Sequence, residues 1–306
     1  IGNPILKEKN IKKNTIFVIE ASSYQIDYSK YFETNIALIL NIAPDHLERH
    51  KTFQNYVNAK LKLIKKQKKK SIALIEKNNG LIRDILKSQN VKSKIKNVDF
   101  KEYDSFYKKI KNNYFKNLSN IKNLSFVLAL SNILKLDNSK ILKVVNSFKG
   151  LNYRQQIVYN KRKFLIINDS KSTSFSSTVP LLQSYENIYW ILGGLAKKGD
   201  KLNLNKKYFK EIKAYIYGTN RAFFSNVLKN KCKLHSSKNL KNILSKLFSD
   251  IKKNKYGKKT ILFYYASSNV FNLVIWYSID PSVRSRGFFS NLVATKIVAS
   301  YTFNNL

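Results

Sequence analysis

The chain has 306 residues, enough for two domains, and 43% of them are hydrophobic, enough for a core in each. Its formal net charge is +39, and such a surplus suggests nucleic acid or an anionic membrane as a partner. The lysines are spread along the whole chain, however, which is typical of an AT-rich genome and of solvated faces, so we expect no nucleic acid as the main partner. The single cysteine, Cys232, excludes an intrachain disulfide and fits a reduced, cytoplasmic location.

Methionine is absent, including at position 1, and we interpret the chain as a fragment or a processed product, favouring a fragment. The sequence contains no Gly-x-x-x-x-Gly-Lys-Ser/Thr loop, no Cys/His zinc pattern and no Gly-x-Ser-x-Gly elbow.

In the first half of the chain, apolar runs alternate with segments of helical periodicity. The expected elements are strands over Thr15–Glu20, Ile36–Ile42 and Ser71–Ile75, a short helix over Tyr28–Glu33 and a longer one over Thr52–Lys68. Gly80–Tyr114 is polar and Lys-rich and predicts a short helix with edge strands. Helices follow over Asn120–Leu136 and Ser139–Phe148, the second ended by Gly150 as a C-cap.

Beyond Gly150 the expected strands are Phe164–Ile167, Ile188–Leu192, Lys213–Tyr217 and Thr260–Tyr264, with helices between them. Ile261–Ile279 carries no charge over 19 residues, the length of a membrane span. Because it contains Asn and Ser, we favour a buried strand followed by an atypical tail and expect no stable membrane insertion.

Strands that alternate with helices indicate βαβ units and parallel sheets. We therefore predict an α/β fold with two Rossmann-like parallel-sheet domains, residues 1–149 and residues 150–306, the second with an atypical tail from about residue 265. No internal repeat is visible.

Two polar groups directly follow expected strands of the first domain. Glu20 is a candidate Mg²⁺ ligand, since Mg²⁺ prefers hard oxygen ligands, and Ser22 and Gln25 could bind polar groups of a substrate. In the second group, Asp45 and His46 could join a metal or phosphate site. Each group taken alone is equally typical of a capped strand end or a solvated loop.

Further candidates are weaker when considered singly. Asn120 and Asn123 are two amides one helical turn apart, on a face that could bind adenine. Arg154 lies near the expected domain hinge and could reach a phosphate. Asp169, Lys171 and Thr173 follow one strand of the second domain. Gly193 and Gly194, which let the backbone approach a ligand closely, and Lys197, which adds a charge, follow another. Parallel sheets bind ligands at such strand ends.

Taken together, these stretches resemble the Mur ligases, the ATP-dependent, amide-bond-forming ligases of peptidoglycan synthesis. The matching stretches are Gly2–Leu6, Glu20–Gln25, Asn41–Arg49, Ala59–Leu61, Asn120 with Asn123, Gly150–Arg154, Asn168–Thr173 and Gly193–Lys197. The resemblance covers residues 1 to about 200. Within the family, Ser22–Gln25 and Asn168–Thr173 favour the branch that adds D-glutamate to UDP-N-acetylmuramoyl-L-alanine.

The resemblance implies an N-terminally truncated P-loop-type ATPase domain followed by a C-terminal Rossmann-like domain that holds the incoming amino acid. It implies ATP and Mg²⁺ as cofactors, a monomer, and the following roles. Metal sites would use Glu20, His46 and a carbamylated Lys60, with Lys60, His46 and Lys171 as the catalytic set. The UDP-sugar would contact Ser22 and Gln25. ATP would contact Asn120, Asn123, Arg154 and Asp169. D-glutamate and the acyl phosphate would contact Lys171, Thr173 and Lys197.

The sequence departs from the family pattern in three places. Asn117-Leu-Ser-Asn120 replaces Gly-x-His-Asn, Tyr153 replaces a histidine, and the C-terminal Ser-Pro-Ala region cannot be aligned from Tyr264 onward. Because the P-loop motif is absent, we expect the chain to be inactive alone. Alternatives are a folylpolyglutamate-synthase-like ligase, a basic nucleic-acid-binding protein and a non-catalytic remnant.

Overall fold

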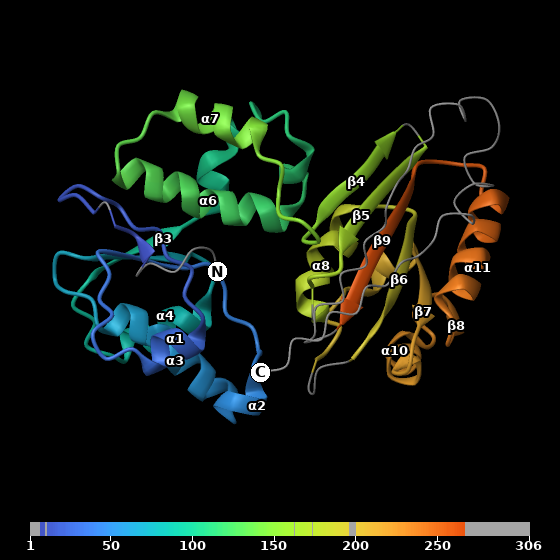
Figure 1. The fold of residues 1–306 in the computed structure, drawn as a ribbon, viewed down its shortest axis with the longest axis horizontal. Helices are drawn as coiled ribbons and strands as arrows, with labels where there is room; N and C mark the ends of the chain where they lie inside the picture. The colour runs from blue at the N-terminus through green and yellow to red at the C-terminus, as the bar shows by residue number, and fades with distance from the viewer. Residues whose placement is uncertain (1–6, 10, 162, 173, 196–199, 267–306) are drawn as a thin grey trace. The chain divides into compact units, whose positions relative to one another are not determined.

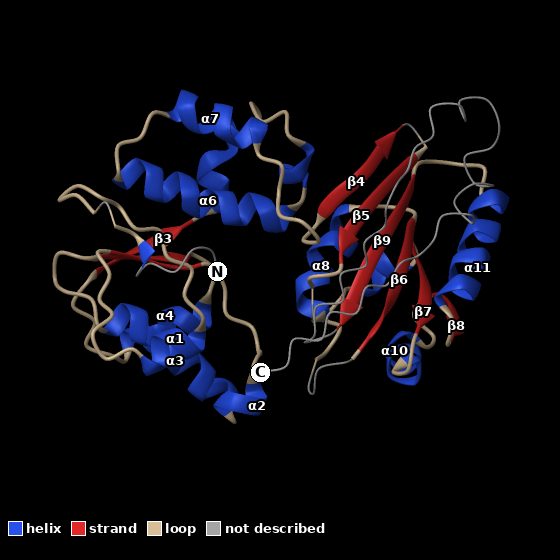
Figure 2. Cartoon of the chain, viewed as in Figure 1, coloured by secondary structure: helices blue, strands red, loops and turns tan. Residues whose placement is uncertain are grey.

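The computed structural model describes residues 7–9, 11–161, 163–172, 174–195 and 200–266. The chain forms two compact units, residues 1–109 with 121–142, and residues 110–120 with 143–306, and each is described by itself. Figure 1 shows their helices and strands, and Figure 2 distinguishes the two types by colour. A domain boundary at Gly150 stays a prediction.

The first unit contains a three-stranded parallel sheet in the order β1 (Ile36–Ile39), β2 (Ile72–Glu76), β3 (Lys94–Val98). Its helices are α1 (Ser23–Tyr28), α2 (Leu47–His50), α3 (Phe53–Lys65), α4 (Gly80–Lys87) and α5 (Asp104–Tyr107), with a 3-10 turn over Phe100–Tyr103. Two further helices, α6 (Leu118–Ile133) and α7 (Asn138–Ser147), each have residues in both units.

Helices cover both faces of this sheet, as a parallel sheet requires. On one face, α3 and α4 pack onto β1 and β2 through Val57, Leu61 and Ile82, which are fully buried. On the other face, Phe126 of α6 packs against Leu74 and Val98. The helix α3 begins where Thr52 accepts a hydrogen bond from the backbone of Asn55, an ordinary N-cap.

The second unit contains a six-stranded sheet in the order β4-β5-β9-β6-β7-β8. The strands are β4 (Gln156–Lys161), β5 (Phe164–Asp169), β6 (Ile188–Gly194), β7 (Ile212–Tyr217), β8 (Lys233–Ser237) and β9 (Lys259–Ala266). The helices are α8 (Phe175–Ser184), α9 (Lys206–Phe209), α10 (Arg221–Leu228) and α11 (Leu240–Lys253), with a 3-10 turn over Asn113–Lys116. All neighbouring strands are parallel except β4, which runs antiparallel to β5.

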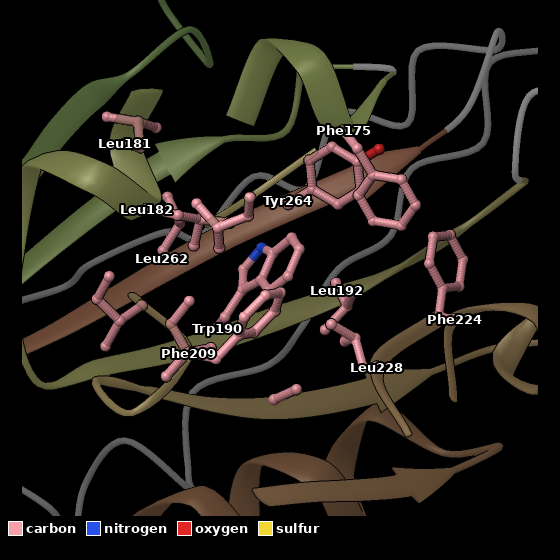
Figure 3. Packing of buried hydrophobic residues seen from close by; sticks show 14 of the residues in the cluster. Phe175, Leu181, Leu182, Trp190, Leu192, Phe209, Phe224, Leu228, Leu262 and Tyr264 are labelled. Carbon is pink, nitrogen blue, oxygen red and sulfur yellow. The ribbon is translucent and has the colours of Figure 1, made fainter. Parts of the chain in front are cut away.

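The last described strand, β9, lies in the centre of this sheet, between β5 and β6. One face is covered by α8, α9 and α10 around an aromatic cluster (Figure 3). In that cluster the Phe175 ring stacks on Tyr264 at 6.0 Å and meets Trp190 edge-on at 6.1 Å. The other face is covered by α11, which packs Ile243 and Leu247 onto the sheet.

The α/β class with sheets covered by helices is confirmed, and so are most of the expected elements. The helix expected over Thr52–Lys68 is α3, the three apolar runs at Ile188, Lys213 and Thr260 are β6, β7 and β9, and the polar stretch after Gly80 supplies a short helix and the edge strand β3. The strand expected over Phe164–Ile167 continues to Asp169.

Two expected elements are wrong. Thr15–Glu20 is not a strand: the segment is extended, unpaired and exposed, with Val18 at 87% relative exposure. A β-prone sequence becomes a strand only where a neighbouring backbone completes the hydrogen-bond ladder, and none of the described residues does so here. The helix expected over Tyr28–Glu33 lies earlier instead, at Ser23–Tyr28, because Ser22 and Gln25 form a capping box.

Two strands were not anticipated, β4 and β8. Both lie at the edges of the second sheet, where β4 has only the three apolar residues Ile157–Tyr159 and β8 is mostly polar. The second sheet is mixed, because β4 runs antiparallel to β5. No helix among the described residues is long and apolar enough to span a membrane. The uncharged stretch Ile261–Ile279 begins within β9, and its part beyond Ala266 lies outside the described residues.

Candidate functional site

The candidate substrate residues of the first unit cap a helix. The backbone N–H of Gln25 donates to Ser22 Oγ at 3.2 Å, and the backbone N–H of Ser22 donates to Gln25 Oε1 at 2.8 Å. Both side chains are exposed at the start of α1. Glu20 lies two residues earlier, in the exposed extended segment. The structure thus gives Ser22 and Gln25 a local structural task, while their contact with a substrate stays a prediction.

His46 lies at the N-cap position of α2 with φ 54°, a left-handed conformation that is uncommon for a residue with a side chain. Its ring nitrogens lie 3.6 Å from Asp45 Oδ2 and 3.4 Å from Glu48 Oε1, and its side chain is 40% exposed. At the other end of this short helix, Lys51 also has a positive φ, 67°. The structure thus places the His46 imidazole between two carboxylates on a tightly turned segment.

A buried histidine ties this segment to α1. His50 Nε2 lies 3.0 Å from Ser23 Oγ, and both residues are buried. The Tyr24 ring stacks on His50 at 5.4 Å with an interplanar angle of 5°, and its edge contacts the His46 ring at 5.0 Å. Sequence reasoning missed His50, Ser23 and Tyr24 as positioning residues, although Ser23 and Tyr24 lie within the stretch Glu20–Gln25 and His50 directly follows the stretch Asn41–Arg49.

Lys60 lies on α3 and is half-buried. Its ammonium lies 5.0 Å from the centre of the Tyr56 ring, a cation–π distance. Tyr56 in turn contacts His50 edge-on at 5.4 Å. The structure therefore connects Lys60 with the Tyr24–His46–His50 cluster through one aromatic side chain.

The described residues do not form a complete set of metal ligands. No group of three or more His, Cys, Asp and Glu side chains within the described ranges is close enough to hold a metal ion. A Mg²⁺ ion commonly takes only one or two protein carboxylates and completes its shell with water and phosphate. The described residues could therefore hold Mg²⁺ only together with water and phosphate oxygens, and no reaction step is derived through the metal.

Asp169 is the most enclosed charged group of the candidate site in the second unit. It ends β5 with 0% relative exposure, and both carboxylate oxygens accept hydrogen bonds. The Gln155 backbone N–H donates to Oδ1 at 3.0 Å, and Ser172 Oγ donates to Oδ2 at 2.6 Å. Thr178 Oγ1 lies 3.4 Å from Oδ2. The carboxylate thus holds together β4, the turn after β5, and α8.

Burial raises the pKa of Asp169 from its ordinary value of 3.8 to about 6. The hydrogen bonds from Ser172 and Gln155 and the nearby Arg154 guanidinium lower this pKa in turn, but they do not offset the loss of water. A carboxyl with a pKa displaced toward neutrality at the carboxyl end of a parallel strand is a functional-site candidate.

The segment between α7 and β4, residues 148–155, has an unusual backbone conformation and is called the hinge segment below. Gly150, Tyr153 and Gln155 all have positive φ, 76°, 64° and 49°. The Tyr153 carbonyl accepts a hydrogen bond from the Lys171 backbone N–H at 2.9 Å. Arg154 and Lys171 themselves have exposed side chains. The Arg154 guanidinium lies near the buried Asp169, and Lys171 follows Asp169 by two residues in the turn after β5.

Asn120 does not have a free amide. Its Nδ2 donates to the Tyr114 carbonyl at 2.7 Å, and Asn120 is 3% exposed. Asn117, at the position where the family has glycine, accepts from the Asn120 backbone N–H at 2.9 Å and donates to Gln155 Oε1 at 3.1 Å. Asn123, one turn further along α6, is exposed. The expected pairing of Asn120 and Asn123 toward adenine stays a prediction.

Some candidates cannot be placed. Thr173 and Lys197 lie outside the described residues. Gly193 and Gly194 end β6, where Gly194 has φ 95°. The partners of Asp169 were missed, and only Ser172 had a visible signal, since it lies inside the Asn168–Thr173 stretch. Gln155 and Thr178 reach Asp169 through the tertiary fold.

Comparisons with known proteins show the family to which the chain belongs. Residues 2–133 match the model of the Mur ligase middle domain. The UDP-N-acetylmuramoylalanine–D-glutamate ligase of Rickettsia prowazekii (strain Madrid E) is 35% identical over 248 residues, 75% of this chain and 55% of the relative. The ligase of the same name from Rickettsia bellii (strain RML369-C) is 32% identical over 284 residues, 86% of this chain and 62% of the relative.

The fold is also found among solved structures. The MurF ligase of Thermotoga maritima, crystallised in complex with ADP, superposes with a TM-score of 0.54 at 14% identity, over 76% of this chain and 58% of that one. At that identity the match shows the fold alone. The chain spans little more than half the length of the curated relatives it matches. The sequence similarity, the middle-domain match and the two helix-covered sheets together show that the chain belongs to the Mur ligase family.

Proposed function

We propose that this chain serves an ATP-dependent ligase that adds D-glutamate to UDP-N-acetylmuramoyl-L-alanine in peptidoglycan synthesis. The observation that carries the proposal is the 32–35% identity to two ligases named for that reaction, over 75–86% of the chain. A cytoplasmic location belongs to the same proposal, since both substrates and ATP are cytoplasmic small molecules. A monomeric state is proposed together with it.

The proposed chemistry has two steps. The alanine carboxylate attacks the γ-phosphorus of ATP, so that an acyl–oxygen–phosphorus bond forms, the bond to the β-phosphate breaks, and ADP leaves. The D-glutamate amine then attacks the acyl carbon, an amide bond forms, and inorganic phosphate leaves after the amine has lost its proton. Both steps depend mainly on positioning and on neutralising the negative charge of the phosphates.

In the first unit we propose that Glu20, His46 and Lys60 lie at the metal sites, with Lys60 carbamylated. Carbamylation would convert the ammonium into a carboxylate and remove its attraction to the Tyr56 ring, which lies 5.0 Å away. Mg²⁺, when bound, would neutralise phosphate charge. Ser22 and Gln25 are proposed to contact the UDP-sugar from the first turn of α1.

For ATP we propose that Arg154 and Asp169 hold the phosphate and ribose, with Asn120 and Asn123 toward adenine. Lys171, Thr173 and Lys197 are proposed to bind D-glutamate and the acyl phosphate. The Arg154 guanidinium near the enclosed Asp169 supports this division, because a cation near a strand end is suited to phosphate oxygens.

The test measures ADP release with ATP, Mg²⁺, UDP-N-acetylmuramoyl-L-alanine and D-glutamate. It is run on the 306-residue chain and on the protein expressed from the whole reading frame that encodes this chain, with any flanking residues. We expect release from the reading-frame product only when both substrates are present. Release with a folate acceptor and L-glutamate instead would overturn the proposal in favour of a folylpolyglutamate-synthase-like ligase.

The same assay tests the role of Lys171, with a matched control at the other end of β5. Lys171→Met removes an exposed ammonium after β5, whereas Lys163→Met removes one just before it. We expect Lys171→Met to lower kcat/KM at least about tenfold and Lys163→Met to leave it within about twofold. Equal effects of the two variants would contradict the role of Lys171.

A further inference from the structure

A hollow of about 260 Å³ lies on the second unit, at the end of the sheet opposite to Asp169. It is formed where the first residues of β7 and β8 meet the last turn of α11, and Figure 1 shows these elements beside one another. Strands β5 to β9 are parallel, so the hollow lies at their amino ends while Asp169 lies at the carboxyl end of β5. Through the strand register Asp169 is level with Ile216 of β7, three residues beyond Lys213, so Lys213 lies about 10 Å from that level along the strand.

Two lysines line the hollow side by side. Lys213 of β7 and Lys233 of β8 are direct partners in the strand register. Two residues further along the same face, the rings of Tyr215 and His235 form the next pair, with centres 5.6 Å apart. Like charges at such neighbouring positions destabilise a sheet. Within the described ranges neither ammonium forms an ion pair.

The acidic residue in the hollow does not balance these charges. Lys246 donates to Asp250 Oδ1 at 2.8 Å, and the Tyr215 hydroxyl donates to Oδ2 at 2.9 Å. His235 Nε2 lies 3.4 Å from the same Oδ2. Asp250 is therefore already paired. Lys253, in the last turn of α11, adds a third ammonium to the lining.

One of these ammonium groups is fixed in place. Lys213 Nζ lies 4.9 Å from the centre of the Tyr189 ring and 3.4 Å from its hydroxyl. Asn254 Nδ2 donates to the same hydroxyl at 3.1 Å, and Tyr189 is fully buried. A cation held by an aromatic ring without a carboxylate partner is already ordered for an incoming anion, which lowers the entropic cost of binding.

We propose that this hollow binds a small phosphate-bearing anion through Lys213, Lys233 and Lys253. Three ammonium groups supply point charges and hydrogen-bond donors suited to phosphate oxygens, and His235 and Tyr215 form the wall between them. The size of the hollow fits inorganic phosphate, pyrophosphate or the phosphate group of a small metabolite. The site is independent of the ligase chemistry proposed above.

The test uses the 306-residue chain and inorganic pyrophosphate as the probe. The chain has three histidines, and His235 alone lies in the second unit, so its imidazole C–H signals in a proton NMR spectrum can be assigned with one His235→Gln variant. We expect pyrophosphate to shift the His235 signals in a saturable way at constant ionic strength and to leave the His46 and His50 signals in place. Because a bound anion favours the imidazolium, the pKa of His235 should rise on binding.

The comparison variant is Lys213→Gln with Lys233→Gln, and the control is Lys206→Gln with Lys210→Gln, an equal loss of charge from the exposed surface at α9. We expect the first pair to weaken pyrophosphate binding at least about tenfold and the control pair to leave it unchanged. The first pair should also raise the midpoint of thermal unfolding without pyrophosphate, because the repulsion is removed; this shows that the variant folds. Inorganic phosphate and ADP, titrated in parallel, distinguish a free ion from a phosphate carried on a larger molecule.

Two results would overturn the proposal. One is that the His235 signals do not move at millimolar pyrophosphate. The other is that both charge-removing pairs weaken binding equally, because the attraction would then arise from the net charge of the whole chain.

Discussion

The backbone N–H of Gln155, the residue before β4, donates a hydrogen bond to the buried Oδ1 of Asp169, so a side chain fastens the start of β4 to the carboxyl end of β5. The bond lies at the point where the hinge segment, with its positive φ angles at Tyr153 and Gln155, enters the sheet. A single carboxylate therefore supports both the conformation of the hinge and the position of Arg154 within it. Arg154, which is proposed to bind ATP, therefore depends on Asp169 for its placement. Asp169 is itself proposed to contact ATP.

Asp169 should make stability depend on pH. The pKa of the Asp169 carboxyl is about 6 in the folded protein, above its ordinary value of 3.8. Between about pH 4 and pH 6 the folded protein therefore keeps the carboxyl proton, which the unfolded chain has released. The contribution of this protonation to the free energy of unfolding is complete below about pH 4 and decreases by about 3 kcal/mol as the pH rises through about 6. We expect the difference in unfolding free energy between wild type and Asp169→Asn to fall by roughly that amount over this range, measured by urea unfolding.

Asp137 provides a control of opposite sign. Hydrogen bonds from Ser139 and from the backbone of Lys140 lower the pKa of this exposed carboxyl. Its contribution is therefore present above its ordinary pKa and is lost as the pH falls below 3.8. Asp137→Asn should leave the dependence between pH 4 and pH 6 intact. A difference between wild type and Asp169→Asn that stays constant over that range would contradict the burial argument.

Gly150 should not tolerate a side chain. It has φ 76°, and a Cβ at this position would lie 2.8 Å from Tyr114 Cε2. Gly218 has φ 93° with no atom within 4 Å of its Cβ position, so Gly218→Ala measures the backbone strain alone. We expect Gly150→Ala to lower the unfolding free energy by about 1–2 kcal/mol more than Gly218→Ala. Combining Gly150→Ala with Tyr114→Leu should remove most of that excess.

Gly193 has a structural reason to be glycine besides the one that the sequence suggests. Its motif predicted a close approach of the backbone to a ligand, whereas its Cβ position lies 2.6 Å from the Tyr217 carbonyl oxygen on the neighbouring strand β7. Backbone cannot move aside as a side chain can. We expect Gly193→Ala to cost about 2 kcal/mol or more in unfolding free energy, seen without any ligand. A variant that unfolds like wild type would show that β6 and β7 can separate there.

The sequence was most informative where local pattern and burial coincide. Helix α3 and strands β6, β7 and β9 were predictable because their apolar residues are continuous or periodic, and Asp169 was identifiable because it follows such a run. The edge strands β4 and β8 were not, because pairing rather than composition makes them strands. Thr15–Glu20 shows the converse: apolar content without a neighbouring strand gives no strand.

The candidate site was predictable as a set of positions but not as a set of interactions. Ser22 and Gln25 were identified, yet their mutual capping explains their presence as well as any substrate does. The link from Asn117 to Gln155 joins residues 38 apart in the chain, and that from His50 to Ser23 joins residues 27 apart. Such pairs depend on the arrangement of the elements, which local periodicity does not contain.

The pair His50 and Ser23 should contribute to stability as a unit. Their side chains meet at 3.0 Å in a buried setting, so either substitution leaves the other polar group without its partner, at a cost of about 1–3 kcal/mol. In a double-mutant cycle of Ser23→Ala and His50→Asn, measured by urea unfolding, we expect the double variant to lose at least about 1 kcal/mol less than the sum of the single variants. The matched control is His46→Asn, since that side chain is 40% exposed and asparagine tolerates its left-handed backbone, so the loss should be smaller and additive with Ser23→Ala. Additive losses for His50→Asn and Ser23→Ala would mean that α1 and α2 are held together by the stacking of Tyr24 on His50 and not by the hydrogen bond.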